Sequence, residues 1–306
     1  MGAADDFLKG FFKQYPEAQN GELNLDELNG LMAAYQQQMN DRPLEDFDGL
    51  SPAQMELLLH APLTAESPLK LREGIEDELR LVPIFTLLEM LIEEIRAAGT
   101  LKLTMTGNLP VRVCTLLYKQ NLMGYEYQLS SERIREDEVS YLWPLKQYAL
   151  DTGIVKKRNN ALSLTKQGEK YMKAAKVTQF TALLKYFTTH FHWGNLYGLE
   201  DMGRAGQMGW AYSLVLLFRY GSNANTSGFY SGKLLQAFGK DLFAPGAGDV
   251  ELLADYHYAY AVRFFECFAD WFGLVQIERG NDYTQPLPER LIVRKSDLFD
   301  RLFQVL

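Results

Sequence analysis

The chain has 306 residues, of which 47% are hydrophobic and 23% are charged, as expected for a folded globular protein. Acidic residues outnumber basic ones by 39 to 31, and the net charge of −8 excludes a general nucleic-acid coat protein. Cys114 and Cys267 are too few for a disulfide framework and fit a reducing compartment. The first residues lack a basic and apolar leader, and no apolar stretch approaches the roughly 20 residues that span a bilayer. We therefore expect a cytoplasmic protein that does not enter a membrane.

Residues 1–70 predict a short helical N-terminal region. Asn24 and Glu27 have the spacing of a capping box, and Ser51 followed by Pro52 marks the start of a second helix. Helices of this length bury little apolar surface alone, so we expect the region to pack on the residues that follow.

Residues 71–176 predict a winged-helix-like domain. Apolar residues recur with helical spacing from Ile84 to Ile95, and short alternating segments further on predict the strands of a hairpin. The predicted order is helix, strand, helix, helix, hairpin and closing helix, at 84–95, 101–104, 110–118, 138–152, 154–165 and from 166 onward. A winged-helix domain has this order, with the first strand able to pair on the edge of the hairpin.

Residues 177–306 predict an aromatic-rich helical domain. Of the 39 Phe, Trp and Tyr residues, 22 lie between Phe180 and Phe272, mostly with helical spacing and with few interleaved Lys or Arg. This pattern favours a large packed core, and the alternative is a stacking platform or an apolar ligand pocket. Helices are expected at 177–193, 210–220, 231–238 and from Asp249 to Gly273.

The end of this domain predicts a second winged-helix-like unit. Gly153 and Gly273 each follow a helix and lead directly into apolar strand residues. A hairpin between 274–277 and 291–293, with a long irregular loop over 279–290, then matches the first hairpin. Chance is the alternative, because a helix that ends at Gly before a strand is common. The predicted fold is therefore mainly α, with tandem winged-helix-like domains and small β-hairpin wings.

Two segments resemble an uncharacterised bacterial protein family. The first, at 42–55, has the pattern PLxDFxGLSPxQM, and the second, at 103–110, has the pattern LTxxGNLP. The run from Leu162 to Gly168 is similar to the second wing strand and exit turn of MarR-type regulators. The resemblance implies a bacterial origin and a winged-helix-like middle. It carries over no catalytic residue, because the family has no assigned activity.

The predicted winged helix is a basic module in an acidic protein. Residues 97–176 carry 13 Lys and Arg against 7 Asp and Glu, a net charge of +6, which leaves −14 for the remainder. Basic side chains on a wing can bind backbone phosphates, although the reading helix, 110–120 or 138–152, offers few side chains for base edges. The candidate nucleic-acid contacts are Lys156, Lys157, Arg158, Lys166, Lys170, Arg112 and Lys119. The alternative is a solvated charged face on a protein-binding winged helix.

No residue pattern indicates an enzyme, a metal site or a cofactor. Cys-x-x-Cys and His-Glu-x-x-His spacings do not occur, and His190 and His192 are two residues apart, which places them on different helix faces. The run Gly203, Gly206 and Gly209 has no preceding strand, so it indicates a turn rather than a phosphate-binding loop.

The sequence therefore predicts a non-enzymatic binding protein whose winged helix contacts DNA, in a regulatory or another role. The first alternative is a protein-interaction or structural module that binds a protein partner or a second copy of the chain. The second alternative is an enzyme with its site in the aromatic half. An exposed helix that continues the surface of the basic cluster would favour the DNA-binding role over the protein-interaction role.

Overall fold

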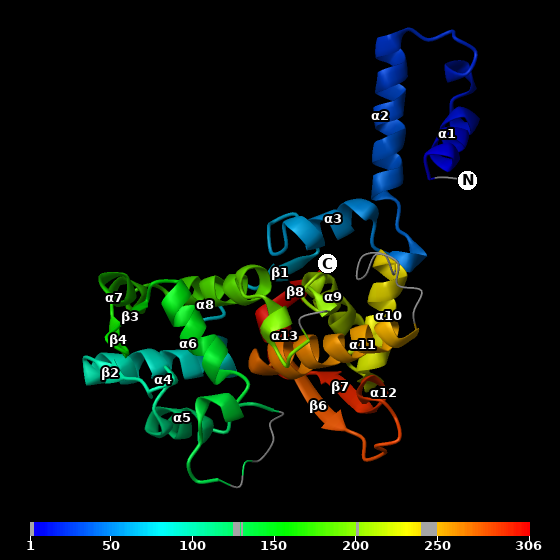
Figure 1. The fold of residues 1–306 in the computed structure, drawn as a ribbon. Coiled ribbons are helices and arrows are strands. Elements are labelled where there is room, and N and C mark those ends of the chain that lie inside the picture. The colour runs from blue at the N-terminus through cyan, green and yellow to red at the C-terminus, as the bar shows by residue number, and fades with distance from the viewer. Residues whose placement is uncertain (1–2, 125–128, 130, 200–201, 240–249) are drawn as a thin grey trace.

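The computed structural model describes residues 3–124, 129, 131–199, 202–239 and 250–306 (Figure 1). Helices predominate over these residues, and the strands found among them form three small antiparallel sheets. The prediction of a mainly α fold is confirmed at this level. Among the described helices, none is long and apolar enough to cross a bilayer.

The N-terminal region consists of α1 (Ala3–Gln14), α2 (Leu25–Asp41) and α3 (Pro52–His60). The predicted capping box forms at Asn24, and Ser51 caps the second helix at its predicted start. In both cases the side chain accepts a hydrogen bond from the backbone N–H three residues later. The α1 and α2 helices lie side by side through Phe11 and Tyr35 and project from the rest of the molecule (Figure 1). Packing on later residues, which we expected for the whole region, is found for α3 against α9 (Trp210–Tyr220), whereas α1 and α2 project away.

The first unit has the predicted order of elements. It contains α4 (Pro83–Ala98), β2 (Leu101–Lys102), α5 (Val111–Tyr118), α6 (Leu142–Asp151), β3 (Val155–Arg158), β4 (Ala161–Leu164) and α7 (Lys166–Met172). The hairpin turns through Asn159 and Asn160, whose φ angles of 48° and 53° are left-handed values that Asn tolerates. The α6 helix begins later than predicted, because Glu136–Glu138 forms a separate 3-10 turn around the buried Glu136.

The second unit follows α8 (Lys176–Lys185) and η5 (Tyr186–His190). Beyond α9 it contains β5 (Asn225–Thr226), α10 (Ser227–Phe238), α11 (Val250–Tyr260), η9 (Ala261–Ala269), β6 (Val275–Arg279), α12 (Leu287–Arg290), β7 (Leu291–Lys295) and α13 (Asp297–Leu302). The α10 helix begins four residues before the predicted position, because the Thr226 hydroxyl accepts a hydrogen bond from the Phe229 N–H. The predicted hairpin forms between β6 and β7, and its loop ends in the unpredicted short helix α12. Asp249, the predicted cap of α11, lies outside the described residues.

The sheets of the two units match in strand order and in register. The orders are β2-β4-β3 and β5-β7-β6, so in each unit the last strand of the hairpin is central. In each sheet two residues of the central strand pair with both neighbouring strands, and they lie at the same distance from the open end of the hairpin. One matched pair of rows is Leu101–Leu162–Lys157 and Asn225–Val293–Ile277.

The two hairpins are also closed in the same way. Gly153 and Gly273, which have φ angles of 70° and 69°, end the preceding helices as predicted. The Thr165 hydroxyl donates to the carbonyl of Gly153 at 2.6 Å, and the Ser296 hydroxyl donates to the carbonyl of Gly273 at 2.6 Å. Each hydroxyl also accepts a hydrogen bond from the backbone N–H three residues later, so it caps the next helix.

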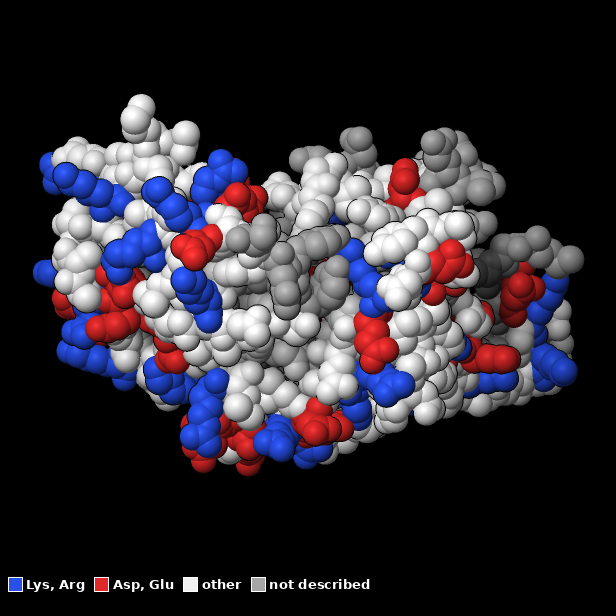
Figure 2. Space-filling model, turned by 90° about the horizontal axis from the view of Figure 1, so that it is seen from below, with Lys and Arg blue, Asp and Glu red and all other residues white. Residues whose placement is uncertain are grey.

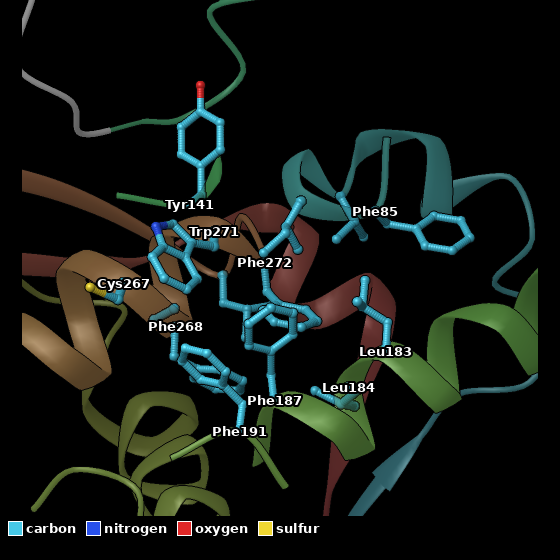
Figure 3. Packing of buried hydrophobic residues seen from close by; sticks show 14 of the residues in the cluster. Phe85, Tyr141, Leu183, Leu184, Phe187, Phe191, Cys267, Phe268, Trp271 and Phe272 are labelled. Carbon is cyan, nitrogen blue, oxygen red and sulfur yellow. The ribbon is translucent and has the colours of Figure 1, made fainter. Parts of the chain in front are cut away.

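One continuous hydrophobic core runs through both units, and the aromatic side chains of η5 and η9 meet residues of α4 and α8 in it (Figure 3). Phe264, Phe268 and Trp271 are at most 2% exposed, which confirms the core interpretation of the aromatic residues. Cys114 and Cys267 are buried thiols. Strand β1 (Leu69–Leu71) pairs with β8 (Phe303–Val305) near the C-terminus, so the expected domain boundary at residue 70 falls inside a strand.

Candidate nucleic-acid interface

The sheet of the first unit exposes a basic face. Side chains alternate between the two faces of a strand, and Val155 is buried, so Lys156 and Arg158 of β3 share the outer face. Lys102 of β2 lies on the same face, across the central strand from Arg158, because both residues pair with Ala161. We call Lys102, Lys156 and Arg158 the basic sheet face.

The basic sheet face lines an open hollow of about 590 Å³. None of the residues described around the hollow carries a carboxylate, and the others are Thr100, Leu103, Asn159, Asn160, Ala161 and Ser163. Three positive charges beside hydroxyl and amide donors favour binding of an anion such as phosphate. Figure 2 shows Lys and Arg side chains, with Asp and Glu side chains among them, on the surface of this end of the molecule.

Lys157 lies on the opposite face of the sheet. It pairs with the buried Leu162, and a Cβ atom placed on Gly107 would be 3.0 Å from the Nζ atom of Lys157. The predicted wing-tip cluster is therefore divided. Lys156 and Arg158 face the hollow, whereas Lys157 lies beside the turn that contains Gly107.

The other predicted contacts do not line the hollow: Lys166, Lys170, Arg112 and Lys119. The two lysines of α7 and Lys119 are exposed, and Arg112 forms an ion pair with Glu94 at 2.7 Å. Lys102 is the basic residue that sequence reasoning missed. The alternation of Leu101, Lys102 and Leu103 carries the signal, since it places Lys102 on the exposed face of a strand.

Of the two candidate reading helices of the first unit, α6 is largely covered by the rest of the molecule. Leu142, Leu145 and Tyr148 are fully buried, and the Tyr148 ring packs on the ring of Tyr186 with centroids 5.0 Å apart. In the second unit the corresponding helix continues into η9, of which all nine residues are buried. Neither α6 nor η9 is exposed enough to enter a DNA groove in this arrangement, and the exposed Arg112 of α5, the other candidate reading helix, does not line the hollow.

A buried ion pair holds the backbone of the segment LTMTGNLP, residues 103–110, in place. The Nζ atom of Lys146 lies 2.5 Å from the Glu136 carboxylate and 3.1 Å from the carbonyl of Gly107. The other carboxylate oxygen of Glu136 accepts a hydrogen bond from the N–H of Leu109 at 2.7 Å. The segment is therefore anchored to α6 from inside through Gly107 and Leu109.

Asp48 forms a second polar cluster, which sequence reasoning missed. Its side chain is 6% exposed and accepts hydrogen bonds from the Tyr212 and Tyr220 hydroxyls, at 3.0 and 2.6 Å, and from the Lys233 ammonium, at 2.9 Å. Arg219 donates to its backbone carbonyl. Burial alone would raise the pKa of Asp48, but these hydrogen bonds outweigh it and hold the pKa below its ordinary value. The segment around Asp48 is thereby fixed to α9 and α10.

We expect Asp48→Ala to lower the free energy of unfolding by about 1–3 kcal/mol, because it leaves buried donors without an acceptor. The folded state lowers the pKa of Asp48, so its stabilisation is present above the ordinary aspartate pKa of about 3.9 and is lost as the pH falls through the lowered value. Urea unfolding of parent and variant near neutral pH and below about pH 4 measures this. Glu45→Ala, an exposed acid on the same loop, is the control. A difference that grows in acid would contradict the assignment.

The outer face of the second sheet differs from the basic sheet face in its charge. Register places Thr226, Gln276 and Glu278 at the positions that correspond to Lys102, Lys156 and Arg158. Arg294 corresponds to Ser163 and is exposed. The face therefore carries one positive and one negative side chain and is neutral, which makes it an internal comparison for the basic sheet face.

The aromatic half contains a Ser–His hydrogen bond whose serine a substrate cannot reach. The Oγ atom of Ser231 lies 2.5 Å from the Nδ1 atom of His257, but Ser231 is fully buried and its hydroxyl also contacts helix carbonyls. Burial lowers the pKa of His257. The glycine run around Gly203 encloses the buried guanidinium of Arg263, to which its backbone carbonyls are acceptors. Within the described residues, no three His, Cys, Asp or Glu side chains gather as metal ligands.

Comparison of the chain with protein-family models, with curated proteins and with solved structures finds no significant match to any of them. The resemblances to an uncharacterised bacterial family and to MarR-type wings stay predictions.

Proposed function

We propose that the chain contains two tandem winged-helix-like units, one over 71–176 and one within 177–306 from α9 onward. Equal strand order, equal register at the central strand and the same glycine–hydroxyl closure support this. Chance repetition of a helix, a glycine and a strand would not explain why β2 pairs with β4 and β5 pairs with β7. Strands β2 and β5 lie far from these hairpins in the sequence.

We propose that the first unit binds duplex DNA at the basic sheet face, without enzyme activity and without reading the base sequence. The observation that carries this proposal is a hollow with three cations and no carboxylate, set against a neutral face at the matching positions of the second sheet. Because α6 and η9 are buried, binding would depend on phosphate contacts, which supply affinity but no sequence information.

A titration of the full chain with random-sequence duplex DNA at several salt concentrations tests the proposal. Each phosphate contact releases counterions, so three contacts give a slope of about −2.7 in a plot of log K against log salt concentration. Duplexes of different sequence should bind with equal affinity. A parent chain that shows no binding at low salt, or a slope near zero, would remove the basic sheet face as a DNA site.

A protein-interaction role is the second candidate, and the arm formed by α1 and α2 favours it. The arm projects from the rest of the molecule (Figure 1), and Leu25 in it is 72% exposed. Two helices that bury Phe11 and Tyr35 against each other leave apolar side chains such as Leu31 and Met32 half-buried. If the chain does not bind DNA, the protein-interaction role is the remaining candidate.

A further inference from the structure

Small side chains form the floor of the hollow at the basic sheet face. Ala161 and Ser163 of the central strand β4 lie on the outer face of the sheet, because Leu162 between them is buried and faces the core. Ala161 and Ser163 both line the hollow. Strand β4 therefore presents a low strip between its two neighbours, β2 and β3.

Long cationic side chains flank this strip on both sides. The register places Lys102 of β2 and Arg158 of β3 on either side of Ala161, and it places Lys156 of β3 beside Ser163. Neighbouring strands lie about 4.8 Å apart, so β2 and β3 are separated by about 10 Å across β4. The hollow is therefore a groove that follows β4, and we call it the β4 groove.

The second sheet carries larger side chains at the positions that form the floor. In the matched register, Ile292 of β7 corresponds to Ala161, and Arg294 corresponds to Ser163. The shared strand order therefore does not by itself produce a groove. The small residues on β4 create it in the first sheet.

The polar side chains of the β4 groove have no partners within the part of the chain that the structure describes. The side chains of Lys102, Lys156 and Arg158 take part in none of the ion pairs or hydrogen bonds found there, and neither do the hydroxyls of Thr100 and Ser163. Three other basic residues of the first unit form ion pairs with carboxylates: Arg112, Lys146 and Lys176. The groove thus gathers charged donors that lack an acceptor among the described residues.

We infer that the β4 groove binds a compact polyphosphate and that this anion competes with DNA for the basic sheet face. The competition rests on the proposed function, whereas the anion site rests on the groove itself. Lys, Arg and hydroxyl side chains are typical phosphate ligands, and the volume of about 590 Å³ lies in the range of small-molecule sites. A chain of linked phosphates brings several negative charges close to three cations, which favours it over a single phosphate.

The β4 groove recognises this ligand through its phosphates alone. None of the described residues that line the hollow is aromatic, and sites that bind unpaired nucleobases usually stack them on aromatic side chains. A nucleoside attached to the phosphate chain therefore adds little affinity. Inorganic tripolyphosphate is the simplest probe of the site.

Isothermal titration calorimetry of the full chain with tripolyphosphate tests the anion site. The parent is expected to bind tripolyphosphate more tightly than inorganic phosphate at the same ionic strength. Ala161→Ile is expected to weaken tripolyphosphate binding at least about tenfold, because the larger side chain fills the floor and keeps the anion from the charged donors. Ala161→Ser keeps the floor low and is expected to bind as the parent does. The fold should accept Ala161→Ile, because the second sheet has isoleucine at this position and isoleucine favours strands.

Displacement of labelled duplex DNA tests the competition. Tripolyphosphate is expected to release DNA from the parent at concentrations at which sodium chloride of equal ionic strength does not. Ala161→Ile is expected to keep the salt slope of about −2.7, because the three cations remain, but to release DNA equally with either salt. Purine and pyrimidine nucleoside triphosphates are expected to act on the parent as tripolyphosphate does.

The outcomes separate the anion site from the proposed function. A parent that binds DNA but not tripolyphosphate, or an Ala161→Ile variant that binds tripolyphosphate as tightly as the parent, overturns the anion site and leaves DNA binding in place. A parent that binds tripolyphosphate but not DNA overturns the proposed function and the competition, and it supports the anion site. A nucleoside triphosphate that binds much more tightly than tripolyphosphate overturns recognition through phosphates alone.

Discussion

Replacing Lys102, Lys156 and Arg158 together with Glu is expected to lower the affinity for duplex DNA by at least roughly 500-fold at 0.1 M salt. Three phosphate contacts contribute about 2.7 decades of binding at this salt concentration through counterion release, and the new carboxylates add repulsion. The loss should be equal for all DNA sequences. Fluorescence anisotropy at several salt concentrations measures both the affinity and the expected flattening of the salt slope.

The second sheet supplies the matched control for this experiment. Arg158→Glu and Arg294→Glu change the same charge on the exposed outer faces of the two sheets. We expect about tenfold weaker binding for Arg158→Glu, from the loss of one contact, and little change for Arg294→Glu. Circular dichroism should be unchanged for both variants, because neither side chain is buried. Equal losses would show that net charge, rather than the basic sheet face, governs binding.

Local signals in the sequence predicted the elements that frame this surface. Gly153 and Gly273 need a left-handed φ that Gly adopts without strain, and both have it. Thr165 and Ser296 follow their hairpins where a helix cap is required. The first hairpin was predictable because Asn159 and Asn160 suit a tight turn between two alternating segments. Each of these signals lies within a few residues of the structure that it specifies.

Features that depend on distant residues were not predictable in this way. Asp48 meets Tyr212 and Lys233, which are more than half the chain away in the sequence. The burial of α6 depends on η5, which follows it by a whole hairpin and two helices. A run of basic residues along the chain also hides the alternation of a strand, because Lys157 and Arg158 are neighbours in the sequence but face opposite sides of the sheet. The residues of the basic sheet face come together through the pairing of β2 and β3 with β4, and a single sequence does not reveal this strand pairing.

Phe268→Ala is expected to lower the free energy of unfolding by about 3–5 kcal/mol. The Phe268 side chain is 2% exposed, and its ring lies 5.0–6.0 Å, between centroids, from four other aromatic rings, Trp193, Trp210, Phe264 and Phe272. These rings come from three separate parts of the chain, and Figure 3 shows Phe268 and Phe272 among the buried side chains of this core. They cannot collapse far into the cavity that the substitution leaves, because each is itself held by further core residues.

Urea unfolding followed by tryptophan fluorescence measures the effect, with Leu25→Ala as the control for loss of an exposed apolar side chain. The control should change the free energy of unfolding by no more than about 0.5 kcal/mol. Phe268→Leu, which fills most of the volume, should recover part of the loss. The core joins α4, α8 and η9, so one cooperative transition is expected for both units. A change near zero in Phe268→Ala would instead mean that the aromatic half is loosely packed, and it would reopen the interpretation of these rings as a ligand pocket.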